Sequence, residues 1–169
     1  MNWFKLLKNQ SIPEFPKKII YNESNFYNHF LKDLEQAREE VIIECPFITR
    51  RRVKLLKPTF EKLVKRGVKV FILTRDPKYH DELMAKQAEE VICYFEELGV
   101  QVLIPRGKTH GKLALIDRKI IYEGSLNILS YAEGWEIMWR IESKDWAGDA
   151  FKSLRYSNLD IFKRKLNLV

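Results

Sequence analysis

Short runs of β-branched residues alternate with longer amphipathic segments through the first hundred residues of the chain. The runs that indicate strands are 41–45, 68–74 and 100–105, and the segments with helical apolar spacing are 51–66 and 80–98. Gly67 and Gly99 follow the two helical segments, as expected at helix ends. Such alternation is typical of parallel strands joined by crossover helices. We therefore predict an α/β fold, an α/β/α sandwich with a mixed, largely parallel sheet.

The pattern changes on both sides of this repeat. An earlier strand is predicted at 17–21 and a helix from Asn22 or Ser24 to about Glu39, while 112–117 and 119–123 indicate a tight antiparallel hairpin. A further strand is expected at 135–141 and a helix from about 145 to the end. Pro13 and Pro16 disfavour regular structure near the N-terminus. We expect an N-terminal arm at 1–16 and a single domain at 17–169.

The composition sets limits on the class of protein. A chain of 169 residues with a net charge of +7 suits one domain and favours polyanionic partners, although an ordinary basic surface would give the same charge. Cys45 and Cys93 lie in apolar stretches, outside any zinc-binding pattern, so both are predicted to be buried, reduced thiols. We find no signal peptide and no run of about 20 apolar residues, so we expect a cytoplasmic protein without stable membrane insertion.

Chemistry is concentrated in the segment 109–127. His110 and Lys112 are two residues apart on a predicted strand, so their side chains should point to the same face. Gly124, Ser125 and Asn127 follow the hairpin and are expected to open a turn into a short helix with free main-chain donors. An imidazole, a cation and neutral donors in one place form a phosphate site with a nucleophile. The other two histidines, at positions 29 and 80, lack this context and are interpreted as structural.

These residues have the spacing of a known motif. The pattern His110-x-Lys112-x4-Asp117-x6-Gly124-Ser125-x-Asn127 resembles the HKD signature of the phospholipase D superfamily. The resemblance implies that His110 attacks phosphorus to form a phosphohistidine, and that Lys112 and Asn127 bind the non-bridging oxygens. Ser125 and Gly124 would support the site, and Asp117 would act structurally through hairpin hydrogen bonds. No metal and no cofactor are implied.

Two further partners of this site follow from the resemblance. Glu136 resembles the acidic residue that holds an active-site imidazole in its working tautomer. The mechanism needs a second histidine, and the chain contains one copy of the motif. Single-motif members of the family form homodimers in which two copies of the motif share one site, so we expect a homodimer here.

The substrate is open between several classes at this point. We favour a nuclease, with the basic run Arg50, Arg51, Arg52 and Lys54 as candidate phosphate-backbone contacts. The same run could be a solvated helix face. The alternatives are a phospholipid phosphodiesterase or transferase, and a non-catalytic nucleic-acid-binding module of the same fold. The chain could also be one part of a larger DNA-processing system.

Overall fold

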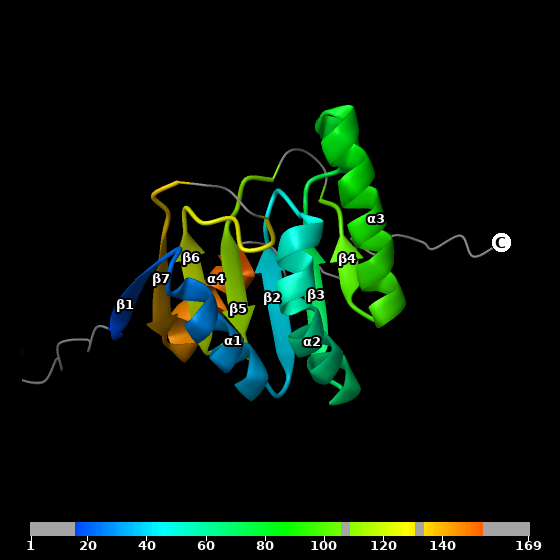
Figure 1. Cartoon of the computed structure of the whole chain (residues 1–169). Coiled ribbons are helices and arrows are strands. Elements are labelled where there is room, and N and C mark those ends of the chain that lie inside the picture. The colour runs from blue at the N-terminus through cyan, green and yellow to red at the C-terminus, as the bar shows by residue number, and fades with distance from the viewer. Residues whose placement is uncertain (1–15, 106–108, 131–133, 154–169) are drawn as a thin grey trace, which may run out of the picture.

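A mixed sheet of seven strands runs through the described part of the molecule, in the order β1-β7-β6-β5-β2-β3-β4 (Figure 1). The computed structural model describes residues 16–105, 109–130 and 134–153. The strands are β1 (Lys18–Asn22), β2 (Glu40–Glu44), β3 (Lys69–Leu73), β4 (Gln101–Leu103), β5 (Leu113–Ile116), β6 (Ile120–Gly124) and β7 (Ile137–Glu142). The predicted arm lies almost entirely outside the described residues, as do residues 154–169 of the predicted C-terminal helix.

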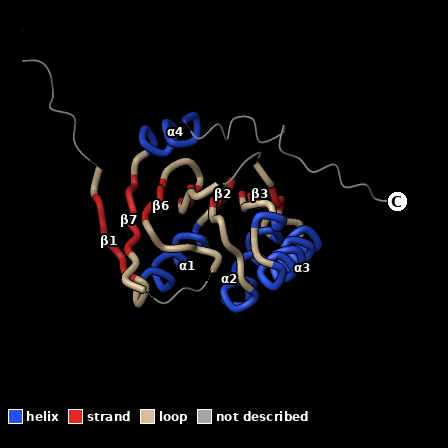
Figure 2. The backbone as a smooth tube through the Cα atoms, turned by 90° about the horizontal axis from the view of Figure 1, so that it is seen from above, coloured by secondary structure: helices blue, strands red, loops and turns tan. Residues whose placement is uncertain are grey.

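Helices cover both faces of this sheet (Figure 2). They are α1 (Phe26–Gln36), α2 (Arg50–Lys65), α3 (Glu82–Leu98) and α4 (Lys144–Ser153), with a short 3-10 turn, η3 (Pro77–Tyr79), before α3. Figure 2 shows α1, α2 and α3 on one side of the sheet and α4 on the other. The predicted three-layer α/β/α arrangement with a mixed sheet is therefore confirmed.

The parallel part of the sheet is smaller than predicted. Only the pairings β2–β3 and β3–β4 are parallel, whereas β1–β7, β2–β5, β5–β6 and β6–β7 are antiparallel. The crossover helices α2 and α3 impose parallel pairing only on the strands that they connect. The hairpin β5–β6 and the two strands beyond it extend the sheet in antiparallel fashion, which the local strand–helix rhythm does not reveal.

Each face of the sheet has its own apolar core because side chains alternate along every strand. On the side of α1, α2 and α3, the largest fully buried side chains include Phe26, Phe30, Phe60, Phe95 and Tyr122. Ala114 and Ile116 of β5 join this core, while Leu113 and Leu115 belong to the second core under α4. The alternation fixes the register of β5, which carries the candidate site at its amino end.

A buried polar network ties α1 to the sheet. Asp33 of α1 accepts a hydrogen bond from the Tyr122 hydroxyl (2.5 Å) and pairs with Arg140 of β7 (Nε to Oδ2, 2.6 Å). Burial and the neighbouring carboxylate raise the pKa of Tyr122 above its usual range. The network holds β6 and β7 against α1, so the strand that precedes the Gly-Ser-x-Asn segment has a fixed position.

Several predicted boundaries and burials are corrected by the structure. The first helix begins at Phe26, with Asn25 as its N-cap residue, because Asn22 is still part of β1. In α3, Ile92 faces the core, whereas Leu83 and Cys93 are exposed, so the prediction that both cysteines are buried is wrong for Cys93. Only one face of α3 packs against the sheet and α2, and Leu83 and Cys93 lie outside that face. Among the described residues, no helix is long and apolar enough to cross a membrane.

Candidate active site

The candidate site lies at the edge of the sheet where β2 and β3 end, the upper end in Figure 1. β5 runs antiparallel to β2 and pairs Leu113 with Glu44, so the start of β5 lies beside the end of β2. His110 and Lys112 directly precede β5 and are not part of it, which corrects the prediction that both lie on a strand. Arg75 follows β3 at the same edge. Carboxyl ends of parallel strands are the usual place for ligands in such sheets.

His110 is exposed, and Arg75 lies against its ring. The Arg75 Nη2 atom is 3.0 Å from His110 Nδ1 and 3.1 Å from Nε2, and it donates to the Thr109 carbonyl oxygen at 3.1 Å. Arg75 is only 8% exposed. The sequence-based interpretation did not include this residue. Its position directly after a buried parallel strand was the one available signal.

Glu44 fixes the segment that carries His110. The Thr109 hydroxyl donates a hydrogen bond to the Glu44 carboxylate. The same carboxylate lies against Gly111, where a Cβ atom would collide with it. A glycine between His110 and Lys112 therefore lets the chain pass close to the end of β2.

Lys112 and Asn127 lie around a buried thiol. The Lys112 ammonium donates to the His110 carbonyl oxygen at 3.3 Å. Cys45 follows β2, with its Sγ atom 4.0 Å from Asn127 Oδ1 and 3.4 Å from the Leu129 N–H that donates to it. Burial raises the pKa of the Cys45 thiol to about 11, although the charge of Lys112 acts in the opposite direction. The thiol therefore stays neutral, and an amide oxygen turned toward it leaves the NH2 group of Asn127 on the other side.

Gly124 and Ser125 join the site to β7. The Gly124 N–H donates to the Lys112 carbonyl oxygen at 3.3 Å, and a Cβ atom at Gly124 would collide with the main chain of Ile137. Ser125 exchanges two hydrogen bonds with Ile137, one through its own N–H (2.9 Å) and one through its hydroxyl oxygen (3.1 Å). Residues 128–130 form a turn and a bend, so the short helix predicted after Asn127 is not found among the described residues.

Glu136 is not in contact with His110 in the described structure. It lies just before β7, and its main-chain N–H donates to the Glu23 carboxylate at 3.2 Å. Among the described residues, the ring nitrogens of His110 lie within hydrogen-bond distance of Arg75. The role of Glu136 in orienting an imidazole stays a prediction.

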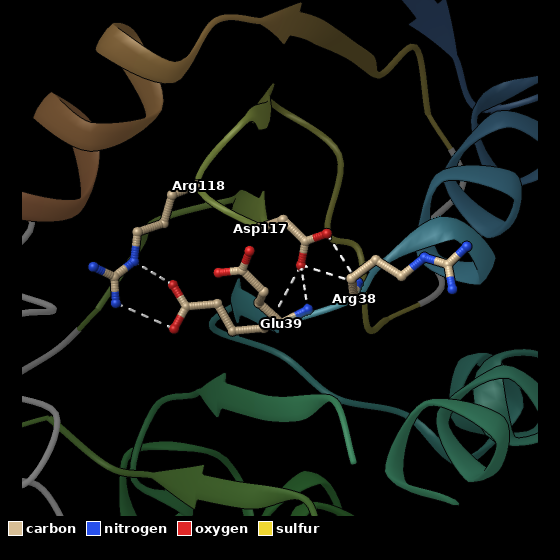
Figure 3. A network of polar contacts seen from close by, with 5 residues as sticks. Arg38, Glu39, Asp117 and Arg118 are labelled. Atoms are coloured by element: carbon tan, nitrogen blue, oxygen red, sulfur yellow. Dashed lines mark hydrogen bonds and ion pairs between the residues drawn. The ribbon is translucent and has the colours of Figure 1, made fainter. Parts of the chain in front are cut away.

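Asp117 lies at the opposite end of the sheet from His110. Its carboxylate accepts hydrogen bonds from the main-chain N–H groups of Arg38, Glu39 and Glu40, at 2.8 to 3.2 Å (Figure 3). These bonds go to the two residues before β2 and to its first residue, and not to the hairpin itself. Arg118 pairs with Glu40 beside them, at the rim of a polar hollow of about 570 Å³. Asp117 therefore anchors the amino end of β2 to the β5–β6 turn, far from His110.

The four basic residues predicted to bind substrate all lie at the start of α2. Arg50 pairs with Glu90 of α3, and the guanidinium of Arg52 lies 3.6 Å from the centroid of the Tyr27 ring. Arg51 and Lys54 are exposed on α2.

The two histidines interpreted as structural have different environments. His29 stacks on Tyr21, with ring centroids 4.4 Å apart. His80 lies 5.1 Å from the Phe47 ring, and Phe47 also has the Arg75 guanidinium 5.0 Å from its centroid. Burial, followed by the charge of Arg75, lowers the pKa of His80. His80 is therefore electrostatically linked to the candidate site.

No group of three or more His, Cys, Asp or Glu side chains suited to a metal ion occurs in the described part of the chain.

Comparisons with known proteins agree with this geometry. The family model described as the phospholipase D-like domain of cardiolipin synthase matches residues 30–155. Cardiolipin synthase A of Buchnera aphidicola subsp. Schizaphis graminum is 31% identical over 126 residues, which are 69% of this chain and 22% of that protein. The chain thus spans about a fifth of the length of this relative.

Two solved structures share the fold. Nuc from Salmonella typhimurium, a phospholipase D family member, has a TM-score of 0.69 at 14% identity, covering 88% of this chain and 97% of its own. NucT from Helicobacter pylori has a TM-score of 0.66 at 20% identity, covering 85% and 96%. Together with the family model, which matches most of the sequence, and the His-Lys motif at the edge of the sheet, these findings show that the chain belongs to the phospholipase D-like family of phosphodiesterases.

Proposed function

We propose that the protein is a metal-independent phosphodiesterase that cleaves nucleic acid through a phosphohistidine intermediate. The observation that carries the proposal is the environment of His110. Its imidazole is exposed, with the cations of Lys112 and Arg75 nearby and the neutral donors of Ser125 and Asn127 on the adjoining loop. Positive charge and neutral donors around one nucleophile suit an anionic phosphorus centre.

The proposed reaction has two displacements. A lone pair on a ring nitrogen of His110 attacks phosphorus, and the bond from phosphorus to the leaving alcohol oxygen breaks as a second imidazole protonates that oxygen. The second imidazole then takes a proton from water, whose oxygen attacks phosphorus and displaces His110. The products are a phosphate monoester and an alcohol. Lys112 and Asn127 donate to the non-bridging oxygens as charge increases on them.

The second imidazole is proposed to be His110 of another copy of this chain. His29 is stacked on Tyr21, and His80 packs on Phe47. A two-fold axis through the edge of the sheet would place two copies of His110 in one site. The protein would then be active as a homodimer.

The choice of nucleic acid is supported by charge at the start of α2. Three arginines occupy the first turn of this helix, and no acidic residue lies in that turn. Cations are unfavourable at a helix N-terminus, so an anionic ligand there would relieve the repulsion. The turn is also bonded to the active-site loop, because the Thr49 N–H donates to the Leu129 carbonyl oxygen at 2.9 Å. Arg51 and Lys54 are the proposed backbone contacts.

A phospholipid substrate is the second candidate, and a specific observation favours it. The curated relative reported above is a cardiolipin synthase. Both candidates use the same phosphorus chemistry, so the reacting residues do not distinguish a nucleic acid from a phospholipid. Contacts between the protein and the rest of the substrate must distinguish them.

The deciding experiment offers both classes of substrate under the same conditions. Purified protein is incubated with labelled single-stranded DNA, double-stranded DNA, RNA and anionic phospholipid vesicles, all in excess EDTA. We expect cleavage of a nucleic acid, with binding that weakens steeply as salt rises. His110→Asn should be inactive and folded, whereas His29→Asn, which alters a histidine outside the site, should keep its activity.

Each other outcome has a defined meaning. Turnover of the lipid alone would replace the nuclease proposal with the phospholipid one. Activity that is lost in EDTA and restored by Mg²⁺ would contradict the metal-independent mechanism.

A further inference from the structure

Arg75 is buried at the site without an acidic partner. It is 8% exposed, and none of the ion pairs among the described residues includes it. Its hydrogen-bond partners among the described residues are the Thr109 carbonyl oxygen and the two ring nitrogens of His110. Its buried Nε atom has no hydrogen-bond partner in the described part of the chain. Removing a charged side chain from water without pairing it is costly, so this position calls for an explanation.

The contact with His110 is of an unusual kind. Nη2 lies nearly equally far from both ring nitrogens, at 3.0 and 3.1 Å. A guanidinium can only donate, and the imidazole lone pair that would attack phosphorus lies in the ring plane and points away from the other nitrogen. An atom equally far from both nitrogens is therefore aligned with neither lone pair. Nη2 lies beside the line of attack, close to where the oxygens of a phosphoryl group on either nitrogen would be.

We propose that Arg75 is a further catalytic residue, which exchanges its contact with the His110 ring for a hydrogen bond to a phosphoryl oxygen. This inference rests on the proposed function. When phosphorus bonds to either ring nitrogen, its oxygens are two bonds from an atom that already lies within about 3 Å of Nη2. Arg75 then donates to a non-bridging oxygen in the transition state and in the phosphohistidine. The incoming oxygen supplies the negative charge that the buried guanidinium lacks in the free protein.

The test measures anion binding separately from turnover, with inorganic phosphate as the probe. Arg75→Met removes the guanidinium and keeps a side chain of similar length. Lys69→Met is the matched control, because it removes one positive charge from the exposed amino end of the same strand. Calorimetry should show that phosphate binds at least about 10-fold more weakly to Arg75→Met than to the wild type, and equally well to Lys69→Met. The kcat of Arg75→Met should fall by about 100- to 1,000-fold on the substrate that the wild type cleaves, as after loss of one oxyanion donor.

A structural role for Arg75 would give a different pattern. Replacing a buried charge by an apolar side chain of similar size is often neutral or stabilising, so the Tm of Arg75→Met should equal or exceed that of the wild type. Should this variant fail to fold, Arg75→Lys serves instead, because a lysine keeps the charge but loses the planar fork. Its phosphate affinity and kcat should both be reduced.

The outcomes separate this inference from the proposed function. Phosphate affinity that is equal in the wild type and Arg75→Met, or undetectable in the wild type, overturns the role of Arg75. If the affinity falls but no diester is cleaved by the wild type, Arg75 is an anion-binding residue and the proposed function is wrong. If the wild type and Arg75→Met cleave the substrate equally well, the proposed function stands without Arg75.

Discussion

The Arg75 side chain lies against His110, and its positive charge also lowers the pKa of His80. Burial is the larger cause that holds the pKa of His80 below its ordinary value of about 6.5, and the charge of Arg75 is the second. We therefore expect Arg75→Met to raise the pKa of His80, since one of the two causes that lower it is removed while the burial persists. The measurement is an NMR titration of the His80 ring proton signals, with Lys69→Met as the control.

The direction of this shift also determines its effect on stability. A histidine whose pKa is lower in the folded state favours folding while it is neutral, above about pH 6.5, and the contribution is lost as the pH falls through the folded pKa. Arg75→Met should lose less stability on mild acidification than the wild type. A pKa of His80 that stays the same or falls in Arg75→Met would show that the two side chains are not coupled.

Single residues differ in how far the sequence predicts them. His110 and Lys112 can be identified because the motif fixes their type and spacing. Arg75 cannot be identified in this way, since Leu-Thr-Arg-Asp after a strand resembles any solvated loop. Only the pairing of strands in the sheet brings Arg75 next to His110, which is 35 positions later in the sequence. Cys93 was assigned to the core for a related reason: the apolar stripe of α3 contains Ile92 beside it, and one residue decides which face is buried.

At the scale of secondary structure, the close approach of β6 to β7 depends on a glycine. A Cβ atom at Gly124 would collide with the main chain of Ile137 and Met138, which cannot move without breaking the β7 pairing. Gly124→Ala should lower the free energy of unfolding by about 1–3 kcal/mol, as overpacking does elsewhere. Urea denaturation monitored by circular dichroism gives the value.

A second glycine provides the control for that experiment. Gly148 is inside α4, and a Cβ atom there would meet nothing within 4 Å. Gly148→Ala should raise the free energy of unfolding by about 0.5–1 kcal/mol, because alanine favours the helix. Equal effects of the two substitutions would mean that the close approach at Gly124 is not what makes the glycine necessary.

The elements themselves were more predictable than their order. β2, β3 and β4 follow from their β-branched runs, and α2 and α3 from their apolar spacing and the glycines that end them. The position of β1 beside β7 does not follow, because Ile20 and Trp139 are paired across more than a hundred residues and no local pattern records the pairing. The antiparallel pairing of β5 with β2 is long-range as well, whereas the β5–β6 hairpin is local and was predicted.

At the scale of the whole molecule, the proposed mechanism places one reacting imidazole in each chain. We expect a homodimer by analytical ultracentrifugation, and no turnover by a heterodimer of wild-type and His110→Ala chains purified through two different affinity tags. The shared site of such a heterodimer lacks one of its two imidazoles. Wild-type and His110→Ala homodimers treated with the same tags are the controls.

The heterodimer result has two alternatives. A heterodimer that keeps half the wild-type rate would show that each chain has a complete site. Turnover by a protein that is strictly monomeric would show the same, and His80 would become the histidine to substitute next.

The spacing within the motif is also a length in space. Lys112 and Asp117 lie directly before and after β5, whose four residues extend over about 13 Å at about 3.3 Å per residue. One end of the motif carries Lys112, the proposed phosphate ligand, and the other end holds the amino end of β2 through Asp117. A single residue inserted into β5 would lengthen the strand by about 3.3 Å and move every later side chain to the opposite face of the sheet. The four-residue gap between Lys112 and Asp117 is therefore tied to both the length and the register of β5.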